Sequence, residues 1–255
     1  MERLFPGRQA PVFYEACLDS TNRLLKEWAV QGAAHGTVLI AGRQTGGRGR
    51  LGRSFASPEG GLYLSVLFRP ACSLEQAASL SALAALAVCR AVRDAAGVAP
   101  GIKWPNDVVL NGKKLCGILA ESVLGSDGAR LIVGIGVNGN LRLEDFPEDL
   151  RQTACSLLSE TGKPVDLRAL EERLIREMDA LYAAWEADSL SLLKEYRGLC
   201  LTCGRDVRIL RDGESRPAKA LSVNGDYSLR VAWPDGREED VRFGEVSVRG
   251  LLGYV

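Results

Sequence analysis

Hydrophobic residues recur along the chain at two spacings, and each spacing predicts a type of element. Apolar side chains on one face predict a short helix between the capping residues 19–22 and Gly32. Short apolar runs bounded by turn-forming residues predict strands at residues 37–41, 62–68, 102–104, 108–110, 115–121 and 131–137. Asn111-Gly112, between two of these strands, is the pair most typical of a tight β-hairpin.

Further segments have the pattern of helices. A capping box at residues 73–76 precedes an Ala- and Leu-rich helix that stops at Gly97 and that we expect to be buried. Asp166 opens an amphipathic helix that runs to about Trp185, with Glu and Arg on its outer face. A shorter helix ends near Gly198.

After these helices the pattern changes to short strands with no helix among them. The strands are predicted at residues 207–210, 218–223, 227–233 and 241–248. Turn sequences lie between them, at Asn224-Gly225 and at residues 234–236. We therefore expect a small antiparallel barrel, with the boundary to the preceding part of the chain at residues 198–204.

Composition and charge narrow the classes of function. The 255 residues include 32 Lys and Arg against 32 Asp and Glu, and this zero net charge argues against bulk electrostatic binding to nucleic acid or membrane. His35 is the only histidine, which rules out metal sites and relays that need two or more histidines. No Gly-x-Ser-x-Gly elbow accompanies it, so we interpret His35 as a structural residue.

The seven cysteines are an odd number with no signal peptide before them, and they predict free thiols in the reducing cytoplasm. Cys200 and Cys203 form a C-x-x-C, but the chain has no second pair to complete a four-ligand zinc site. No apolar stretch approaches the roughly 18 residues of a membrane span, so we expect no membrane association.

Residues 42–53 are unlike the rest of the chain, with five glycines, four arginines and no acidic residue. Residues 47–52 satisfy G-x-G-x-x-G and residues 47–54 resemble a Walker A motif. However, residues 55–61 cannot start the helix that both phosphate-binding motifs require. Glycines expose backbone N–H groups and arginines supply fixed donors, so an anion is the expected partner. A flexible solvated loop is the alternative, and single-stranded nucleic acid fits less well because repeats and interleaved aromatic residues are lacking.

A second polar cluster is predicted around the Asn-Gly hairpin. Residues 103–107 read Lys-Trp-Pro-Asn-Asp, and the returning strand begins with Lys113-Lys114. Each part has a structural alternative: a core position for Trp104, a turn for Asn106 and Asp107, and edge-strand charge for Lys113. Lys114 precedes an apolar strand and needs an anionic partner if it is drawn inward.

Five motifs stand in a fixed order along the chain. They are Ser20-Thr21-Asn22, Gln44 with Gly-Arg-Gly-Arg-Leu-Gly-Arg at 47–53, Lys-Trp-Pro-Asn-Asp at 103–107, Lys-Leu-Cys-Gly-Ile-Leu at 114–119, and Gly-Ile-Gly-Val-Asn at 134–138. Their order and spacing resembles that of biotin protein ligases, also called biotin–acetyl-CoA-carboxylase ligases, over about residues 15–255. The resemblance implies an α/β (α+β) catalytic domain of the class II synthetase type, with a mixed sheet and flanking helices, at residues 1–200. An SH3-like β-barrel is implied at residues 201–255.

A two-step reaction follows from the resemblance. Biotin and ATP, with Mg²⁺, first give biotinyl-5′-AMP and pyrophosphate, and the biotinyl group then passes to a lysine of a biotin carboxyl carrier protein. An anion must approach a polyanion in the first step, so the reaction needs cations around both reactants. The mixed anhydride is easily hydrolysed, so a loop that closes over it suits the site.

The resemblance also implies roles for individual residues. Ser20, Thr21 and Gln44 correspond to ligands of the biotin rings. The closing loop corresponds to Arg48, Gly49 and Arg50, and the lysine on the biotin carboxylate and the α-phosphate corresponds to Lys114. The expected catalytic residues are Lys114, Arg48 and Asp107, with Asp107 as a base or orienter for the acceptor lysine and no metal ligand assigned. The other expected binding residues are Asn22, Lys103, Trp104, Asn106, Gly117 and Asn138. No covalent enzyme intermediate is needed, so the cysteines have no assigned role and Cys116 is expected to pack.

Only 18 residues precede Asp19, too few for the winged helix-turn-helix of bifunctional relatives. We therefore expect a monofunctional ligase that does not bind DNA, as a monomer or homodimer. One alternative is a lipoyl or octanoyl transferase of related fold, which the motifs at 47–53 and 103–107 disfavour. The other is a non-catalytic adenylate-sensing or DNA-binding regulator, which the short N-terminal segment and the zero net charge disfavour.

Overall fold

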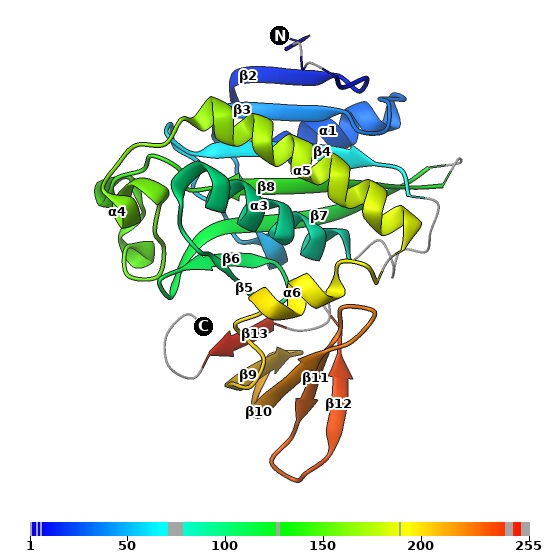
Figure 1. Ribbon diagram of the computed structural model, residues 1–255, viewed down its shortest axis with the longest axis vertical. Helices are drawn as coiled ribbons and strands as arrows, with labels where there is room; N and C mark the ends of the chain where they lie inside the picture. Colours follow the sequence, from blue (N-terminus) through cyan, green and yellow to red (C-terminus); the bar gives the residue numbers. More distant parts are fainter. Residues whose placement is uncertain are drawn as a thin grey trace.

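The computed structural model describes residues 2–3, 5, 7–70, 79–125, 128–188, 190–242 and 247–250. These residues form a large mixed sheet flanked by helices and a small antiparallel sheet near the C-terminus (Figure 1). The predicted α/β (α+β) class, with a mixed sheet and flanking helices, is confirmed. No helix in the described part of the chain is long and apolar enough to cross a membrane.

Eight strands build the large sheet in the order β1-β2-β3-β4-β8-β7-β6-β5. Their bounds are β1 Glu2–Arg3, β2 Val12–Leu18, β3 Val38–Gln44, β4 Leu62–Phe68, β5 Gly101–Lys103, β6 Asp107–Leu110, β7 Lys113–Gly125 and β8 Gly128–Val137. The β2–β3 pair is parallel and the other pairs are antiparallel. The sequence pattern predicted six of these strands but neither β1 nor β2. In β2 only Val12 is fully buried, so the strand lacks a clear apolar alternation.

Helices cover both faces of this sheet. Helices α3 (Leu80–Ala96) and α5 (Leu167–Ala187) lie in front of it in Figure 1, and α1 (Thr21–Val30) lies behind. Alternation along β3 divides the core accordingly, since Ile40 joins the cluster of α3 and α5 whereas Leu39 joins the cluster of α1. All seven residues of β4 are buried between these layers.

The helix ends follow the predicted signals. Ser20 caps α1 by accepting a hydrogen bond from the Arg23 N–H, and Asp166 caps α5 by accepting from two backbone N–H groups. Helix α3 ends at Gly97, which adopts the left-handed conformation with φ of 66°. The capping box predicted at residues 73–76 lies outside the described residues. The described residues also include two short helices, α4 (Leu157–Thr161) and α6 (Leu193–Leu199), and α6 is the predicted shorter helix.

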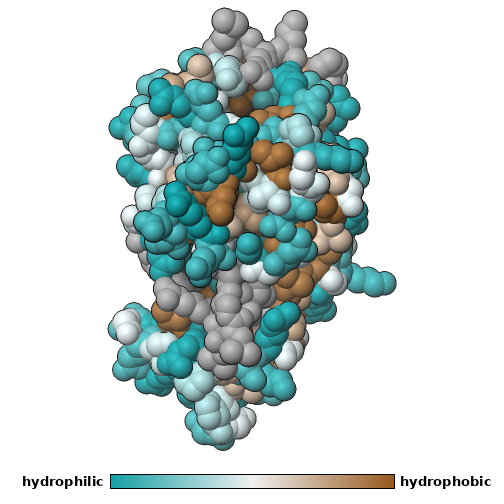
Figure 2. Space-filling view, turned by 90° about the vertical axis from the view of Figure 1, so that its left-hand side faces the viewer, coloured by the Kyte–Doolittle hydropathy of each residue, from teal (hydrophilic) through white to brown (hydrophobic). Residues whose placement is uncertain are grey.

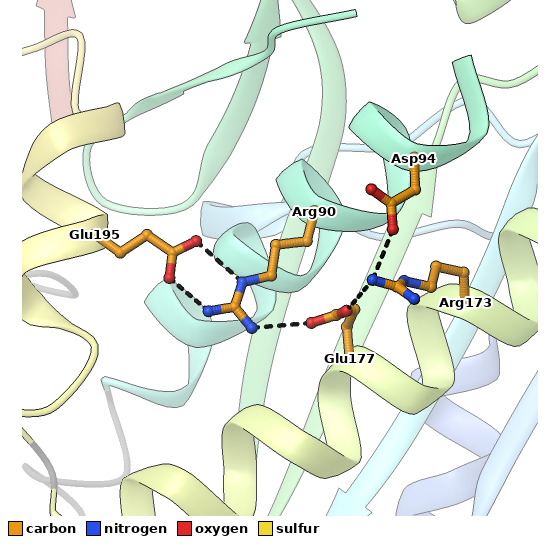
Figure 3. A network of polar contacts seen from close by, with 5 residues as sticks. All are labelled: Arg90, Asp94, Arg173, Glu177 and Glu195. Atoms are coloured by element: carbon orange, nitrogen blue, oxygen red, sulfur yellow. Dashed lines mark hydrogen bonds and ion pairs between the residues drawn. The ribbon is translucent and has the colours of Figure 1, made fainter. Parts of the chain in front are cut away.

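Charged side chains connect α3, α5 and α6 (Figure 3). Arg90 of α3 binds both carboxylate oxygens of Glu195 in α6 at 3.0 and 2.5 Å and binds Glu177 of α5 at 3.1 Å. Arg173 extends the network, because its guanidinium contacts Glu177 at 2.8 Å and Asp94 at 2.6 Å. The network therefore ties α6, the helix that leads into the C-terminal sheet, to the helices of the large sheet.

The C-terminal sheet has five antiparallel strands in the order β12-β11-β10-β9-β13. Their bounds are β9 Asp206–Arg211, β10 Glu214–Val223, β11 Leu229–Ala232, β12 Glu238–Val241 and β13 Ser247–Gly250. This arrangement agrees with the predicted SH3-like barrel, while the boundary between residues 200 and 201 stays a prediction. The indole N–H of Trp104 donates to the Tyr227 carbonyl at 2.9 Å, so the turn between β10 and β11 contacts the predicted motif at 103–107 directly.

Candidate active site

A cavity of about 500 Å³ lies where the start of α1, the segment after β3, the turns around β6 and the strands β7 and β8 meet. This volume is in the range of pockets that hold small-molecule ligands. Its lining includes every residue predicted to be catalytic or to bind a ligand: Ser20, Thr21, Asn22, Gln44, Arg48, Gly49, Arg50, Lys103, Trp104, Asn106, Asp107, Lys114, Gly117 and Asn138. Patches of hydrophobic surface lie among hydrophilic residues on the side of the molecule seen in Figure 2.

Lys114 and Asp107 form an ion pair in the cavity wall, with Nζ and Oδ1 2.8 Å apart. A β-bulge between β6 and β7 aims the lysine, because Val108 pairs with Cys116 whereas Val109 pairs with Lys114. The extra residue lets Leu115 and Cys116 both enter the core while Lys114 faces the cavity. Lys114 points inward and, as expected for such a position, pairs with an anion, the Asp107 carboxylate.

The Arg- and Gly-rich segment that follows β3 folds back on itself. Phe55 N–H donates to the Gly47 carbonyl at 2.9 Å, Gly49 N–H donates to the Arg53 carbonyl at 2.7 Å, and a 3₁₀ turn occupies Arg50–Gly52. Residues 53–61 do not continue into a helix, which confirms that the Rossmann and P-loop interpretations do not apply. At Gly47 a Cβ atom would lie 2.3 Å from the Phe55 carbonyl oxygen, so the fold of this segment requires glycine there.

Positive charge dominates the cavity wall. Among the described residues that line it, five are cationic (Arg48, Arg50, Arg53, Lys103 and Lys114), and Asp107 is the single carboxylate. Burial lowers the pKa of Arg50, and the Asp107 carboxylate opposes this effect. The chain has zero net charge, but the charge around this cavity is positive. An anionic ligand would reduce the repulsion between these cations.

Neutral donors and acceptors line the part of the cavity at the start of α1. Gln44 Oε1 accepts from the Thr21 N–H at 2.8 Å, and Gln44 Nε2 donates to the Ser57 hydroxyl at 3.0 Å. The Thr21 hydroxyl lies 3.1 Å from Gln44 Oε1 and 2.7 Å from the hydroxyl of Ser65. This part of the site can recognise a polar, uncharged group through hydrogen bonds.

A partly buried polar network holds the side chain of Asn22 in place. Its Nδ2 donates to the Leu119 carbonyl at 3.1 Å and to the Glu121 carboxylate at 2.9 Å, so its Oδ1 must accept from the Ser65 hydroxyl at 2.6 Å. Lys26 binds the other oxygen of Glu121 at 2.6 Å. Burial raises the pKa of Glu121, but the bonds from Lys26 and Asn22 outweigh it and hold that pKa below its usual value.

Two further predicted residues support the walls through their side-chain amides. Asn106 Nδ2 donates to the Ile118 carbonyl at 2.8 Å, and Asn138 Nδ2 donates to the Cys155 carbonyl at 2.8 Å. Trp104 is only 2% exposed and belongs to both the hydrophobic core and the cavity lining. It therefore occupies the core position that was one interpretation of its sequence, and it also faces the predicted binding site. The ligand contacts of these residues stay predictions.

Phe55 was missed by the sequence interpretation although it lines the cavity. Its ring lies over Gly117 and Gly136, which pair across β7 and β8, and a Cβ atom on either would come within 2.8 or 2.5 Å of the ring. Two glycines inside strands were the available signal, because they mark close approach of another group. Phe146, Leu150 and Val248 also line the cavity, and no local pattern indicated them.

His35 and Cys116 lie outside the predicted chemistry. His35 packs against Phe68 and Tyr182, accepts a hydrogen bond from the Arg69 N–H, and has a pKa lowered by burial. Cys116 is fully buried in the core, where burial raises the pKa of its thiol. Both therefore have the structural roles expected for them. The described residues contain no cluster of three His, Cys, Asp or Glu side chains suited to a metal ion.

Comparison with known proteins places these features in a family. Residues 14–138 match the biotin/lipoate A/B protein ligase family. The chain is 33% identical to the bifunctional ligase/repressor BirA of Bacillus subtilis, over 88% of this chain and 70% of that protein. It is 38% identical to the biotin–[acetyl-CoA-carboxylase] ligase of Mycobacterium tuberculosis, over 74% of this chain and 71% of that protein. The structure of biotin protein ligase from Aquifex aeolicus in complex with biotin and ATP superposes with a TM-score of 0.83 at 31% identity, covering 95% of this chain and all of that one. The chain therefore belongs to the biotin protein ligases, within the biotin/lipoate A/B protein ligase family.

Proposed function

We propose that this protein uses ATP to activate biotin as biotinyl-5′-AMP and transfers the biotinyl group to a lysine of a biotin carboxyl carrier protein or domain. One observation carries the proposal: the cations and the neutral hydrogen-bonding groups that the five motifs predicted line a single cavity. The relative from Aquifex aeolicus, at a TM-score of 0.83, was solved in complex with biotin and ATP, which supports the same pair of substrates.

In the first step, a carboxylate oxygen of biotin attacks the α-phosphorus of ATP, and the bond from that phosphorus to the pyrophosphate oxygen breaks. Both reactants are anions, so their approach needs positive charge fixed in advance around them. Lys114 supplies one such charge, and Arg48 and Arg50 supply others from the segment after β3. Mg²⁺, bound with ATP, would add charge on the phosphates, and Asp107 is the carboxylate in the described lining that suits it.

The neutral part of the cavity suits the biotin ring system. A ureido group offers two N–H donors and one carbonyl acceptor, which Thr21, Gln44 and Ser20 can match with hydroxyl and amide groups. Phe55, Ile118 and Ile135 offer apolar contact to the sulfur-containing ring and the aliphatic chain. A carboxylate at the end of that chain would then reach the cationic part of the same cavity.

In the second step, the acceptor lysine amine must lose a proton before it attacks the carbonyl carbon of the adenylate, with AMP as the leaving group. Asp107 is the acidic side chain in the described lining, and it can orient the amine or accept its proton. Lys114 lies 2.8 Å from this carboxylate, so binding of the α-phosphate by Lys114 would release Asp107 for this task.

The carrier is the partner that this chemistry requires, and the ligase acts on it as a monomer or homodimer. The described cysteines are all free thiols, which supports a reducing compartment, and we place the protein in the cytoplasm.

Biotin-dependent exchange of labelled pyrophosphate into ATP tests the first step without any carrier. We expect exchange with biotin and none with lipoate or octanoate. Equal exchange with lipoate or octanoate would contradict the selectivity for biotin, and binding of biotin without exchange would favour a non-catalytic sensor. Transfer is then tested by mass spectrometry of a biotin carboxyl carrier domain, with a Lys→Arg acceptor variant as the control.

A further inference from the structure

Cys200 and Cys203 lie close together in the short connection between α6 and β9. Their sulfur atoms are 3.7 Å apart, and the Cys203 thiol donates a hydrogen bond to Cys200 Sγ. Both residues are partly exposed, whereas Cys89, Cys116 and Cys155 are buried. The pair is therefore accessible to small reagents in a way that the core cysteines are not.

The segment that contains this pair forms hydrogen bonds to the large sheet on one side and to the C-terminal sheet on the other. Thr202, between the two cysteines, accepts the Trp104 N–H at 2.9 Å, and the Leu201 N–H donates to the Ile102 carbonyl at 2.8 Å. On its other side, the Gly204 N–H donates to the Ala220 carbonyl of β10 at 2.8 Å. The pair thus lies where the candidate active-site motif at 103–107 and the C-terminal sheet are joined.

The hydrogen bonds around Cys200 favour its thiolate. Donation from the Cys203 thiol lowers the pKa of Cys200 to about 7 despite burial, and the N–H groups of Thr202 and Cys203 contribute in the same direction. The pKa of Cys203 is raised, first by its bond to Cys200 and then by burial. A nucleophilic thiolate beside a second thiol is the arrangement that thiol–disulfide exchange requires.

We propose that Cys200 and Cys203 are a reversible oxidation site for small disulfides, and that closing their disulfide slows the reaction proposed above by disturbing Trp104. The Cys200 thiolate attacks one sulfur of the oxidant, whose disulfide bond breaks and releases one thiolate. The Cys203 thiol then loses its proton to solvent, and its sulfur attacks Cys200 to release the second thiolate. Two protein thiols are oxidised to one disulfide, and the oxidant is reduced to two thiols.

We expect closure of the disulfide to shift the segment between the two cysteines. The sulfurs have to approach from 3.7 Å to a bonding distance of about 2.05 Å. Thr202 lies between the two cysteines and contacts both Cys200 and the Trp104 N–H, so we expect movement of this segment to act on Trp104 first. Trp104 also lines the cavity of the candidate active site. A change at Thr202 on oxidation of the two thiols would therefore reach that cavity through Trp104.

The test uses the full chain with Cys17 and Cys72 replaced by serine, so that the remaining cysteines are the pair and the three buried thiols. The protein is treated with oxidised glutathione, the free thiols are alkylated, and peptides are mapped by mass spectrometry. We expect a Cys200–Cys203 disulfide that dithiothreitol reverses. Cys203→Ser should retain a glutathione adduct on Cys200, and Cys200→Ser should form neither product. A lasting adduct on Cys200 in the chain with both cysteines, or no reaction there, overturns the proposal.

The consequence of closure is measured in two ways. Hydrogen exchange at the Trp104 amide should be faster in the oxidised form, and this readout does not depend on any enzymatic activity. Pyrophosphate exchange should fall by roughly tenfold, as expected for a small misplacement in a catalytic site, and return on reduction. Unchanged amide exchange in the oxidised form overturns the connection to the site. Absence of pyrophosphate exchange in the reduced protein instead contradicts the proposed function and leaves the thiol chemistry measurable.

Discussion

The ammonium of Lys114 lies 2.8 Å from the carboxylate of Asp107, so each is the counter-ion of the other in the cavity wall. About a quarter of each side chain is exposed, which lets an incoming anion compete with Asp107 for the lysine. Binding of an anionic reactant would therefore change the environment of both residues at once. This relationship connects the first chemical step, which needs the cation, with the second, which needs the carboxylate.

Replacement of Lys114 by alanine should reduce biotin-dependent pyrophosphate exchange by about 10²–10³-fold, because the developing charge at the α-phosphate loses a fixed cation. Circular dichroism should remain that of the parent, since the side chain is outside the core. The matched control is Lys113→Ala, which removes the same charge one residue away and outside the cavity lining. Equal losses in the two variants would contradict the role of Lys114.

Arg48→Ala should release biotinyl-5′-AMP from the enzyme. Arg48 lines the cavity from the segment that folds back after β3, so its loss removes a charged contact that keeps the adenylate in place. We expect faster release of the adenylate and more labelling of bystander lysines, measured by mass spectrometry of an added unrelated protein. Arg43→Ala is the control, because Arg43 lies in β3 just before this segment and not in the cavity lining. Unchanged retention in Arg48→Ala would refute this role.

Much of the site could be predicted because its chemistry is concentrated in short motifs. The residues of each motif lie within a few positions of one another, and a cation beside an apolar strand or a glycine inside one departs visibly from a packing pattern. Lys114 was recognisable in this way, Gly117 was expected from the family resemblance, and the structure brings both to the cavity.

The partners of these residues could not be predicted, because they come from distant parts of the chain. Ser65 and Glu121, which hold Asn22, are 43 and 99 positions away from it. Ser65 lies within the apolar strand β4, and Glu121 follows the apolar run of β7, so neither has a local signature of its role. Strand β2, which lies next to the short edge strand β1, was missed for a related reason, since a partly exposed strand lacks the continuous apolar run that identified β4.

Arg90→Met should destabilise the protein by about 1–2 kcal/mol, the amount typical of lost hydrogen bonds to charged groups that are partly exposed. The methionine retains apolar contact but leaves Glu195 without its bidentate partner, whereas Glu177 keeps Arg173. Urea denaturation measures the change in the free energy of unfolding. Arg176→Met is the control, because Arg176 is mostly exposed and 3.9 Å from Glu172, and it should change stability by less than about 0.5 kcal/mol. Equal effects would show that the network adds nothing.

Glu121→Gln should make the protein less stable above about pH 5 and lose this effect in acid. The pKa of Glu121 is depressed in the folded state, so the charged carboxylate stabilises the fold at pH values above the unfolded pKa of about 4.3. That contribution is lost as the pH falls through the lower, folded-state pKa, because the protonated acid no longer pairs with Lys26.

Glutamine keeps an oxygen for Asn22 but cannot form the ion pair with Lys26, so the variant isolates the charge. Thermal unfolding between pH 3 and pH 8 should show a gap of about 1 kcal/mol between parent and variant near neutrality that closes toward the acid end. Glu27→Gln is the matched control on the exposed side of α1 and should show no comparable gap. A gap that stays constant down to the lowest pH would mean that Glu121 stabilises the fold through its shape and hydrogen bonds, and not through the charge that holds Asn22 behind the site.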